Sequence, residues 1–107
     1  MEKRVLYNKD VCGIYKITNI KTQEAYIGKS TNIKTRWINH LKTVIGLSGA
    51  ARSTLHNRME KDGLWNYTFE VLEEVNKDNL SAREAYWINF YDTKNYGLDM
   101  KEGSYGT

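Results

Sequence analysis

The stretch CGIYKITNIKTQEAYIGKS, residues 12–30, decides the fold of this chain. Two runs rich in β-branched and aromatic residues, 11–18 and 23–28, flank the polar tetrapeptide NIKT, and this pattern predicts a β-hairpin. The runs contain the tripeptides Gly13-Ile14-Tyr15 and Tyr26-Ile27-Gly28, in which the same three residue types appear in opposite order. The repetition raises the question of whether the hairpin also carries a site built from two phenols.

The register of the hairpin determines whether these two tyrosines meet. We expect Thr18 to pair with Gln23 across a four-residue loop. Tyr15 then lies opposite Tyr26, and the two isoleucines of the tripeptides pair on the other face. Opposed residues in an antiparallel pair share a face, with Cβ atoms about 5 Å apart. A slip of one residue would separate the phenols onto opposite faces, so the isoleucine pairing and the tyrosine pairing are one prediction.

Hydrophobic periodicity downstream predicts three helices and one more strand. The helices are expected from a cap at Ser30 or Thr31 to about Ile45, from about Ala51 to Lys61, and from about Leu80 to Tyr91, with the strand at Tyr67 to Val75. The expected inward-facing residues are Ile33, Trp37, Leu41, Val44 and Ile45, then Leu55 and Met59, then Leu80, Ala85, Ile88 and Tyr91. The order β-β-α-α-β-α predicts an α+β fold, a small three-stranded antiparallel sheet flanked by helices.

Composition restricts the class of protein. The 107 residues suit one domain spanning 1–107, and 40% hydrophobic residues can build a core. The apolar runs are too short to span a membrane, and the first ten residues lack the apolar segment of a secretory signal. Cys12 is the single cysteine, which argues against a disulfide or a zinc site. We therefore expect an intracellular, cytoplasmic protein with no membrane contact.

Positive charge is concentrated in the middle of the chain. Between Ala25 and Met59 there is no Asp or Glu, whereas acids outnumber bases from Glu60 onward. The basic residues of that block are Lys29, Lys34, Arg36, Lys42, Arg52 and Arg58. Unopposed positive charge suits a polyanion such as nucleic acid, although a solvated basic face would produce the same pattern.

The combination of motifs resembles the GIY-YIG nuclease family. Both tripeptides are present, Arg36 and His40 follow four residues apart on the next helix, and Glu84 lies in the later segment REAYWI. The resemblance covers about residues 11–103, and it implies the same three-stranded sheet that the periodicity predicts. It also implies a metal-dependent endonuclease that hydrolyses DNA, of the homing, restriction or repair kind.

Within this resemblance each motif residue has an implied role. Tyr15 is the general base, Tyr26 binds the phosphate or the attacking water, and Arg36 contacts the scissile phosphate through its planar fork. His40 assists proton transfer or holds the Tyr15 hydroxyl, and Glu84 binds one Mg²⁺ or Mn²⁺ ion. A tyrosine serves as a base only if its pKa falls from about 10 toward neutrality, which nearby positive charge favours and burial opposes.

Two positions have alternative interpretations. Ser81 and Glu84 also fit a capping box, in which Glu84 would bond back to the start of its helix. The family often has an asparagine late in the domain, and in NYGLDMKEG Asp99 or, less well, Asn95 stands near that position. An aspartate there could be a second metal ligand or could repel phosphate.

The expected partner is DNA. We expect Lys29, Lys34, Lys42 and Arg52 to contact phosphates, which positions a duplex without reading its sequence. Sequence recognition must then come from the loop at 46–53, from the glycine-rich tail, or from a separate domain outside this chain. Two other hypotheses are a catalytically silent nucleic-acid-binding module and a structural domain with a basic surface. The oligomeric state is left open.

Overall fold

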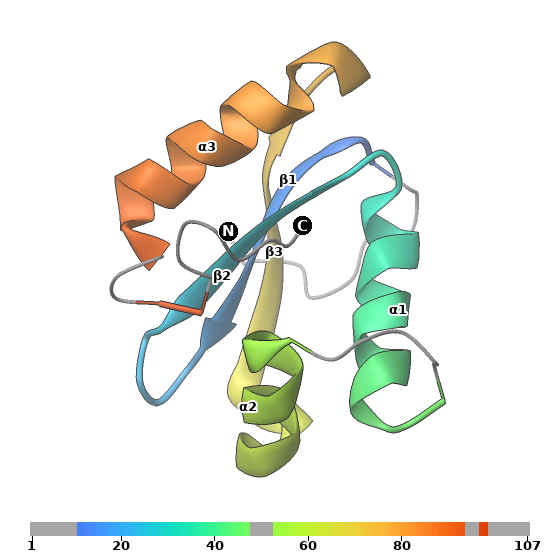
Figure 1. Cartoon of the computed structure of the whole chain (residues 1–107), viewed down its shortest axis with the longest axis vertical. Coiled ribbons are helices and arrows are strands. Elements are labelled where there is room, and N and C mark those ends of the chain that lie inside the picture. The colour runs from blue at the N-terminus through green and yellow to red at the C-terminus, as the bar shows by residue number, and fades with distance from the viewer. Residues whose placement is uncertain (1–10, 48–52, 94–96, 99–107) are drawn as a thin grey trace, which may run out of the picture.

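The computed structural model describes residues 11–47, 53–93 and 97–98 (Figure 1). Its elements are β1 (Gly13–Asn19), β2 (Ala25–Ser30), α1 (Ile33–Val44), α2 (Thr54–Asp62), the 3₁₀ turn η1 (Leu64–Asn66), β3 (Tyr67–Glu74), the 3₁₀ turn η2 (Lys77–Asn79) and α3 (Leu80–Tyr91). The predicted order β-β-α-α-β-α and the α+β class are therefore confirmed. Within the described ranges, none of the helices has the length and apolar character needed to cross a membrane.

The sheet separates two hydrophobic layers. Its strand order is β2-β1-β3 with both pairings antiparallel, so β1 is central and β2 forms an edge. In Figure 1, α3 lies on one side of the sheet and α1 and α2 lie on the other. Because successive strand residues point to opposite faces, Tyr15 and Ile17 enter the core under α1 and α2, whereas Ile14 and Ile27 pack beneath α3.

The hairpin register differs by two positions from the expected one. Thr18 pairs with Ala25 rather than Gln23, and Tyr15 lies opposite Gly28 rather than Tyr26. A shift of two residues preserves the alternation of faces, so Tyr15 and Tyr26 still share a face as diagonal neighbours. The prediction of directly opposed phenols was wrong, but the prediction that both phenols lie on one face is correct.

Steric fit at Gly28 and side-chain bonding at Asn19 explain the observed register. The Tyr15 ring lies across Gly28, where a Cβ atom would come within 2.4 Å of the phenol oxygen, so only glycine can stand opposite this ring. Asn19 is buried and organises a longer loop, since its Oδ1 accepts hydrogen bonds from the backbone N–H groups of Lys21 and Thr22. Alternating hydrophobicity carries neither of these signals.

Several helix details also differ from expectation. α1 ends at Val44, and Ile45, expected in the buried stripe, is 59% exposed because the chain turns away at Gly46. α2 begins at Thr54 rather than near residue 51, because the Ser53 side chain caps it. The bounds of α3 are as predicted.

The inward stripe of α3 was predicted correctly at Leu80 and Ile88 and wrongly at Ala85 and Tyr91. Ala85 and Tyr91 are exposed, and the residues that pack against the sheet are Leu80, Trp87 and Ile88. At helical spacing Glu84 lies on that same stripe. A carboxylate is thus turned toward the sheet at a position where an apolar side chain would ordinarily be found.

Candidate active site

The Tyr15 phenol is the centre around which the predicted site residues gather. Its side chain is fully buried, its ring meets Trp37 edge-on at 6.0 Å between centroids, and its hydroxyl lies 2.8 Å from Nε2 of His40. The Arg36 guanidinium lies near the same hydroxyl, and its charge acts on the Tyr15 pKa. Two elements distant in sequence, β1 and α1, therefore fix one oxygen atom in position.

α1 supplies both Arg36 and His40 from successive turns. The i, i+4 spacing places the two side chains on one face of the helix, and that face packs against β1. His40 is 1% exposed, so it is an interior group and not a decoration of the helix surface. The expectation that His40 holds the Tyr15 hydroxyl agrees with this geometry.

Tyr26 completes an aromatic cluster on the same face of the sheet. Its ring centroid lies 6.3 Å from that of Tyr15 and 5.7 Å from that of His40. Unlike Tyr15, Tyr26 is only partly buried. It is therefore the phenol of the pair that lies nearer to solvent.

Burial dominates the electrostatics of the site. It raises the pKa of the Tyr15 hydroxyl well above its usual value, and the charge and hydrogen bond of Arg36 oppose this rise without overcoming it. Burial, the positive charge of Arg36 and the neighbouring imidazole of His56 together lower the pKa of His40 to about 3. At neutral pH the site accordingly holds a neutral phenol and a neutral imidazole.

Glu84 approaches the site from the α3 side of the sheet. Its Oε1 lies 3.2 Å from Nζ of Lys29 on β2, and its charge is close enough to contribute to the raised Tyr15 pKa. α3 starts at Leu80 with Asn79 as N-cap and with no side-chain cap bond, so the capping-box alternative for Glu84 is wrong. Because α3 begins at Leu80, Glu84 lies in its second turn, whereas a capping box would place it in the first turn.

Tyr15 and Glu84 belong to opposite faces of the sheet, and the edge strand β2 lies between them. Tyr15 extends over Gly28, and the next residue, Lys29, points to the other face and meets Glu84. The site is thus a sheet edge with α1 on one side and α3 on the other.

The donor set limits what metal could bind. Within residues 11–47, 53–93 and 97–98, no three His, Cys, Asp or Glu side chains cluster closely enough to hold an ion. Glu84 is a single, partly exposed carboxylate, 21% accessible, and this suits a hard cation that retains most of its water. Such an ion would have to share the carboxylate with the ammonium group of Lys29.

The predicted phosphate-binding residues are only partly placed. Lys34 lies in the first turn of α1 and Lys42 is exposed in its last turn, while Lys29 is engaged with Glu84. Arg52, Asp99 and Asn95 lie outside the described residues. The predicted phosphate-binding residues that the structure describes therefore lie on β2 and α1, the elements that carry Tyr26 and His40.

Sequence reasoning missed His56 of α2. It is 6% exposed, and its Nε2 lies 2.8 Å from Nδ1 of His40. The available signal was the S-x-x-H spacing at the start of a helix, where His56 replaces the usual Glu or Gln of a capping box. That pattern predicts a cap, but it does not predict a contact with a helix sixteen residues earlier in the chain.

These features define a known class of catalytic domain. A family model for the GIY-YIG catalytic domain matches residues 11–97, and the chain belongs to this family. Among curated proteins, intron-associated endonuclease 1 of Enterobacteria phage T4 is 27% identical over 97 residues. That match covers 88% of this chain but 38% of the phage protein, so the chain spans well under half of its relative.

Solved structures agree with the fold. The catalytic domain of the homing endonuclease I-TevI superimposes with a TM-score of 0.75 at 28% identity, covering 85% of this chain and 99% of that domain. A glutamate-to-alanine mutant of the I-TevI catalytic domain gives a TM-score of 0.72 at 26% identity, covering 90% and 99%. The three-stranded sheet with its flanking helices is therefore the fold of these domains.

Proposed function

We propose that this chain is a metal-dependent endonuclease domain that hydrolyses DNA phosphodiester bonds. The observation that carries the proposal is the gathering of Arg36 and His40 around the Tyr15 hydroxyl, with Glu84 on the other face of the same edge strand. The relatives named above are endonucleases, and this supports the same reaction class here. Members of the family generally use divalent metals. We propose Mg²⁺ or Mn²⁺ as the ion here, because a hard cation that keeps most of its water can be held by the single carboxylate of Glu84.

Arg36 is proposed to bind the scissile phosphate. Its guanidinium lies near the Tyr15 hydroxyl, and a planar fork with several N–H donors can contact a phosphate while it keeps its charge beside the phenol. Tyr26, the partly exposed phenol of the pair, is placed to donate to the phosphate or to the attacking water. Lys34 and Lys42 are proposed to hold neighbouring phosphates of the duplex.

Tyr15 is proposed to remove the proton from the attacking water. Because its pKa is raised in the free protein, it starts as a neutral phenol. It must first release its own proton to solvent water, and the resulting phenolate then takes a proton from the attacking water. A cation held by Glu84 would supply positive charge that neutralises the phosphate and favours the phenolate. His40 and Arg36 contribute to the same end, since a hydrogen bond donated to the phenol oxygen stabilises its charged form.

Plasmid nicking tests this function. Supercoiled DNA is incubated with the chain in Mg²⁺, in Mn²⁺ or in excess chelator, and linear, branched and single-stranded substrates are compared. Tyr15→Phe and Glu84→Gln should each lower the rate by about 100-fold or more. Their matched controls, Tyr86→Phe and Glu60→Gln, change the same groups at exposed positions and should leave cleavage intact. Full activity of both site variants contradicts the mechanism.

The alternative of a silent binding module has some structural support. Tyr15 is fully buried, and Lys29 already neutralises Glu84 in the absence of an added cation. A silent module should bind DNA in a salt-dependent manner and leave every substrate uncut in either metal. Cleavage that disappears in Tyr15→Phe eliminates this alternative.

A further inference from the structure

We infer that His56 sets the tautomer of His40 and thereby directs a hydrogen-bond donor at the phenol oxygen of Tyr15. His56 is a positioning residue in this scheme, since it acts on the reacting group through His40. The inference deepens the proposed function, because its catalytic consequence rests on Tyr15 being the base. Its structural part stands independently and can be measured without substrate.

A buried chain of hydrogen bonds joins α2 to Tyr15. The backbone N–H of Ser53 donates to Nδ1 of His56 at 3.1 Å, Nε2 of His56 lies 2.8 Å from Nδ1 of His40, and Nε2 of His40 lies 2.8 Å from the Tyr15 hydroxyl. All three side chains are almost inaccessible to water. These ring-to-ring bonds are therefore made inside the core, where a mismatched pair of donors or acceptors is costly.

The donor-to-acceptor direction of this series of hydrogen bonds is determined at its α2 end. A backbone amide is a donor only and cannot rotate, so Nδ1 of His56 must accept from it. The Ser53 hydroxyl lies 3.3 Å from the same nitrogen, and a hydroxyl can rotate to donate to it as well. In a neutral imidazole the proton is then on Nε2, which donates to Nδ1 of His40. By the same rule His40 carries its proton on Nε2 and donates to Tyr15. The low pKa of His40, about 3, keeps this imidazole neutral and so preserves the tautomer choice.

The donor-to-acceptor direction of these hydrogen bonds matters because Tyr15 has to lose a proton. With this tautomer the phenol oxygen accepts from His40 while the Arg36 charge lies nearby, and both interactions strengthen as negative charge develops on it. The Tyr15 proton is also directed away from His40. With the opposite tautomer Tyr15 would donate to His40 Nε2, and that acceptor would not stabilise the phenolate.

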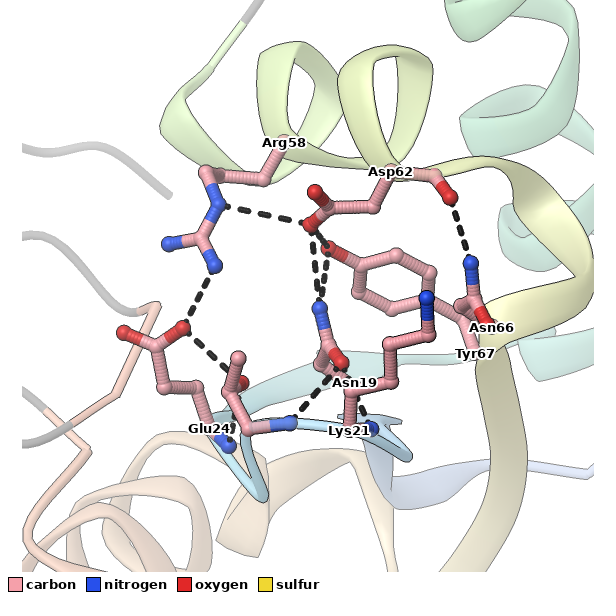
Figure 2. Close-up of polar contacts among 8 residues, drawn as sticks. Asn19, Lys21, Glu24, Arg58, Asp62, Asn66 and Tyr67 are labelled. Carbon is pink, nitrogen blue, oxygen red and sulfur yellow. Dashed lines mark hydrogen bonds and ion pairs between the residues drawn. The ribbon is translucent and has the colours of Figure 1, made fainter.

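The position of His56 depends on how α2 is held. Figure 2 shows the Arg58 side chain between the carboxylates of Glu24 and Asp62, at 2.6 Å and 3.5 Å. Asp62 also accepts hydrogen bonds from Asn19 at 3.0 Å and from Tyr67 at 2.9 Å. This set of contacts, the α2 clamp, ties the helix to the hairpin loop and to the start of β3. It thereby limits the movement of His56 relative to His40.

The test compares two substitutions of His56. His56→Gln preserves the polarity, since its carbonyl oxygen can accept from Ser53 and its amide can donate to His40. His56→Met has comparable bulk but offers only a weak sulfur acceptor and no donor. Nitrogen NMR of the labelled full chain reports the His40 tautomer in each protein, thermal unfolding reports folding, and plasmid nicking in Mg²⁺ gives kcat and KM.

We expect the Nε2–H tautomer of His40 in the parent chain and in His56→Gln, and the Nδ1–H tautomer in His56→Met. The Met variant should lose about 10- to 100-fold in kcat with little change in KM, while the Gln variant stays within a few-fold of the parent. A parent chain with the Nδ1–H tautomer overturns the inference even if the Met variant does not fold. A folded Met variant with the altered tautomer and parental kcat overturns the positioning role. If the tautomers behave as expected but the parent cleaves no DNA, the proposed function fails instead.

Discussion

Replacing Gly28 with alanine should displace the Tyr15 phenol and abolish its catalytic alignment. A Cβ atom at this position would lie 2.3 Å from Cζ and 2.4 Å from the phenol oxygen of Tyr15. Non-bonded heavy atoms of this kind prefer about 3.5 to 4.0 Å, so the ring must move by roughly 1 Å. The bond from His40 at 2.8 Å would then exceed the usual hydrogen-bond range.

Two magnitudes follow from this displacement. Overpacking of the core should cost about 1 to 3 kcal/mol of unfolding free energy, measured by urea denaturation. A misplacement of about 1 Å in a catalytic group typically reduces the rate by about 100-fold, measured by plasmid nicking in Mg²⁺. The loss of activity should therefore be far larger than the modest loss of stability would produce at 25 °C.

Gly46→Ala is the matched control. Gly46 has φ +86°, so alanine there is strained by about 1 to 2 kcal/mol, but no atom lies within 4 Å of the added methyl group. The two alanine variants should thus be similarly destabilised, and only Gly28→Ala should lose cleavage. If Gly28→Ala cleaves like the parent chain, or if Gly46→Ala loses as much activity, the steric argument is wrong.

Three further predictions concern stability and binding. His40 is protonated near pH 6.5 in the unfolded chain and only near pH 3 in the folded chain. The free energy of unfolding should therefore have its full value above pH 6.5 and decrease as the pH falls from 6.5 to 3, and the decrease should be smaller in His40→Gln. Asp62→Ala should cost about 2 kcal/mol in urea denaturation, because it removes the shared acceptor of the α2 clamp; an unchanged midpoint would contradict this. Lys42→Ala should reduce the salt slope of DNA binding by about 0.9, whereas Lys77→Ala on the turn before α3 should not; equal slopes for the two would rule out the phosphate contact.

The fold was largely predictable because it depends on local patterns. Alternation placed Tyr15 and Tyr26 on one face, and that result survived a two-residue error in register since only the parity of the shift matters. The bounds of α3 were recovered, but its inward stripe was recovered only at Leu80 and Ile88. Glu84 occupies an inward position there, and apolar periodicity cannot anticipate a carboxylate whose partner is Lys29 on another element.

The residues of the candidate site were largely predicted from the sequence, but their protonation states were not. Tyr15, Arg36 and His40 were singled out from motif spacing, and the structure brings them together on one hydroxyl. Their protonation states were not accessible in the same way, since burial raises the Tyr15 pKa and lowers that of His40. His56 was missed because its role depends on a contact between two helices.

The sequence by itself determined the order of elements, the shared face of the two phenols and the family. These depend on residue periodicity and motif spacing, which act over a few neighbouring positions. Only the tertiary structure decided the hairpin register, the Lys29–Glu84 pair and the His56–His40–Tyr15 chain. Each of these depends on which atoms of distant segments fit against one another. Burial of these groups then shifts the pKa values of Tyr15 and His40, and so determines their protonation states.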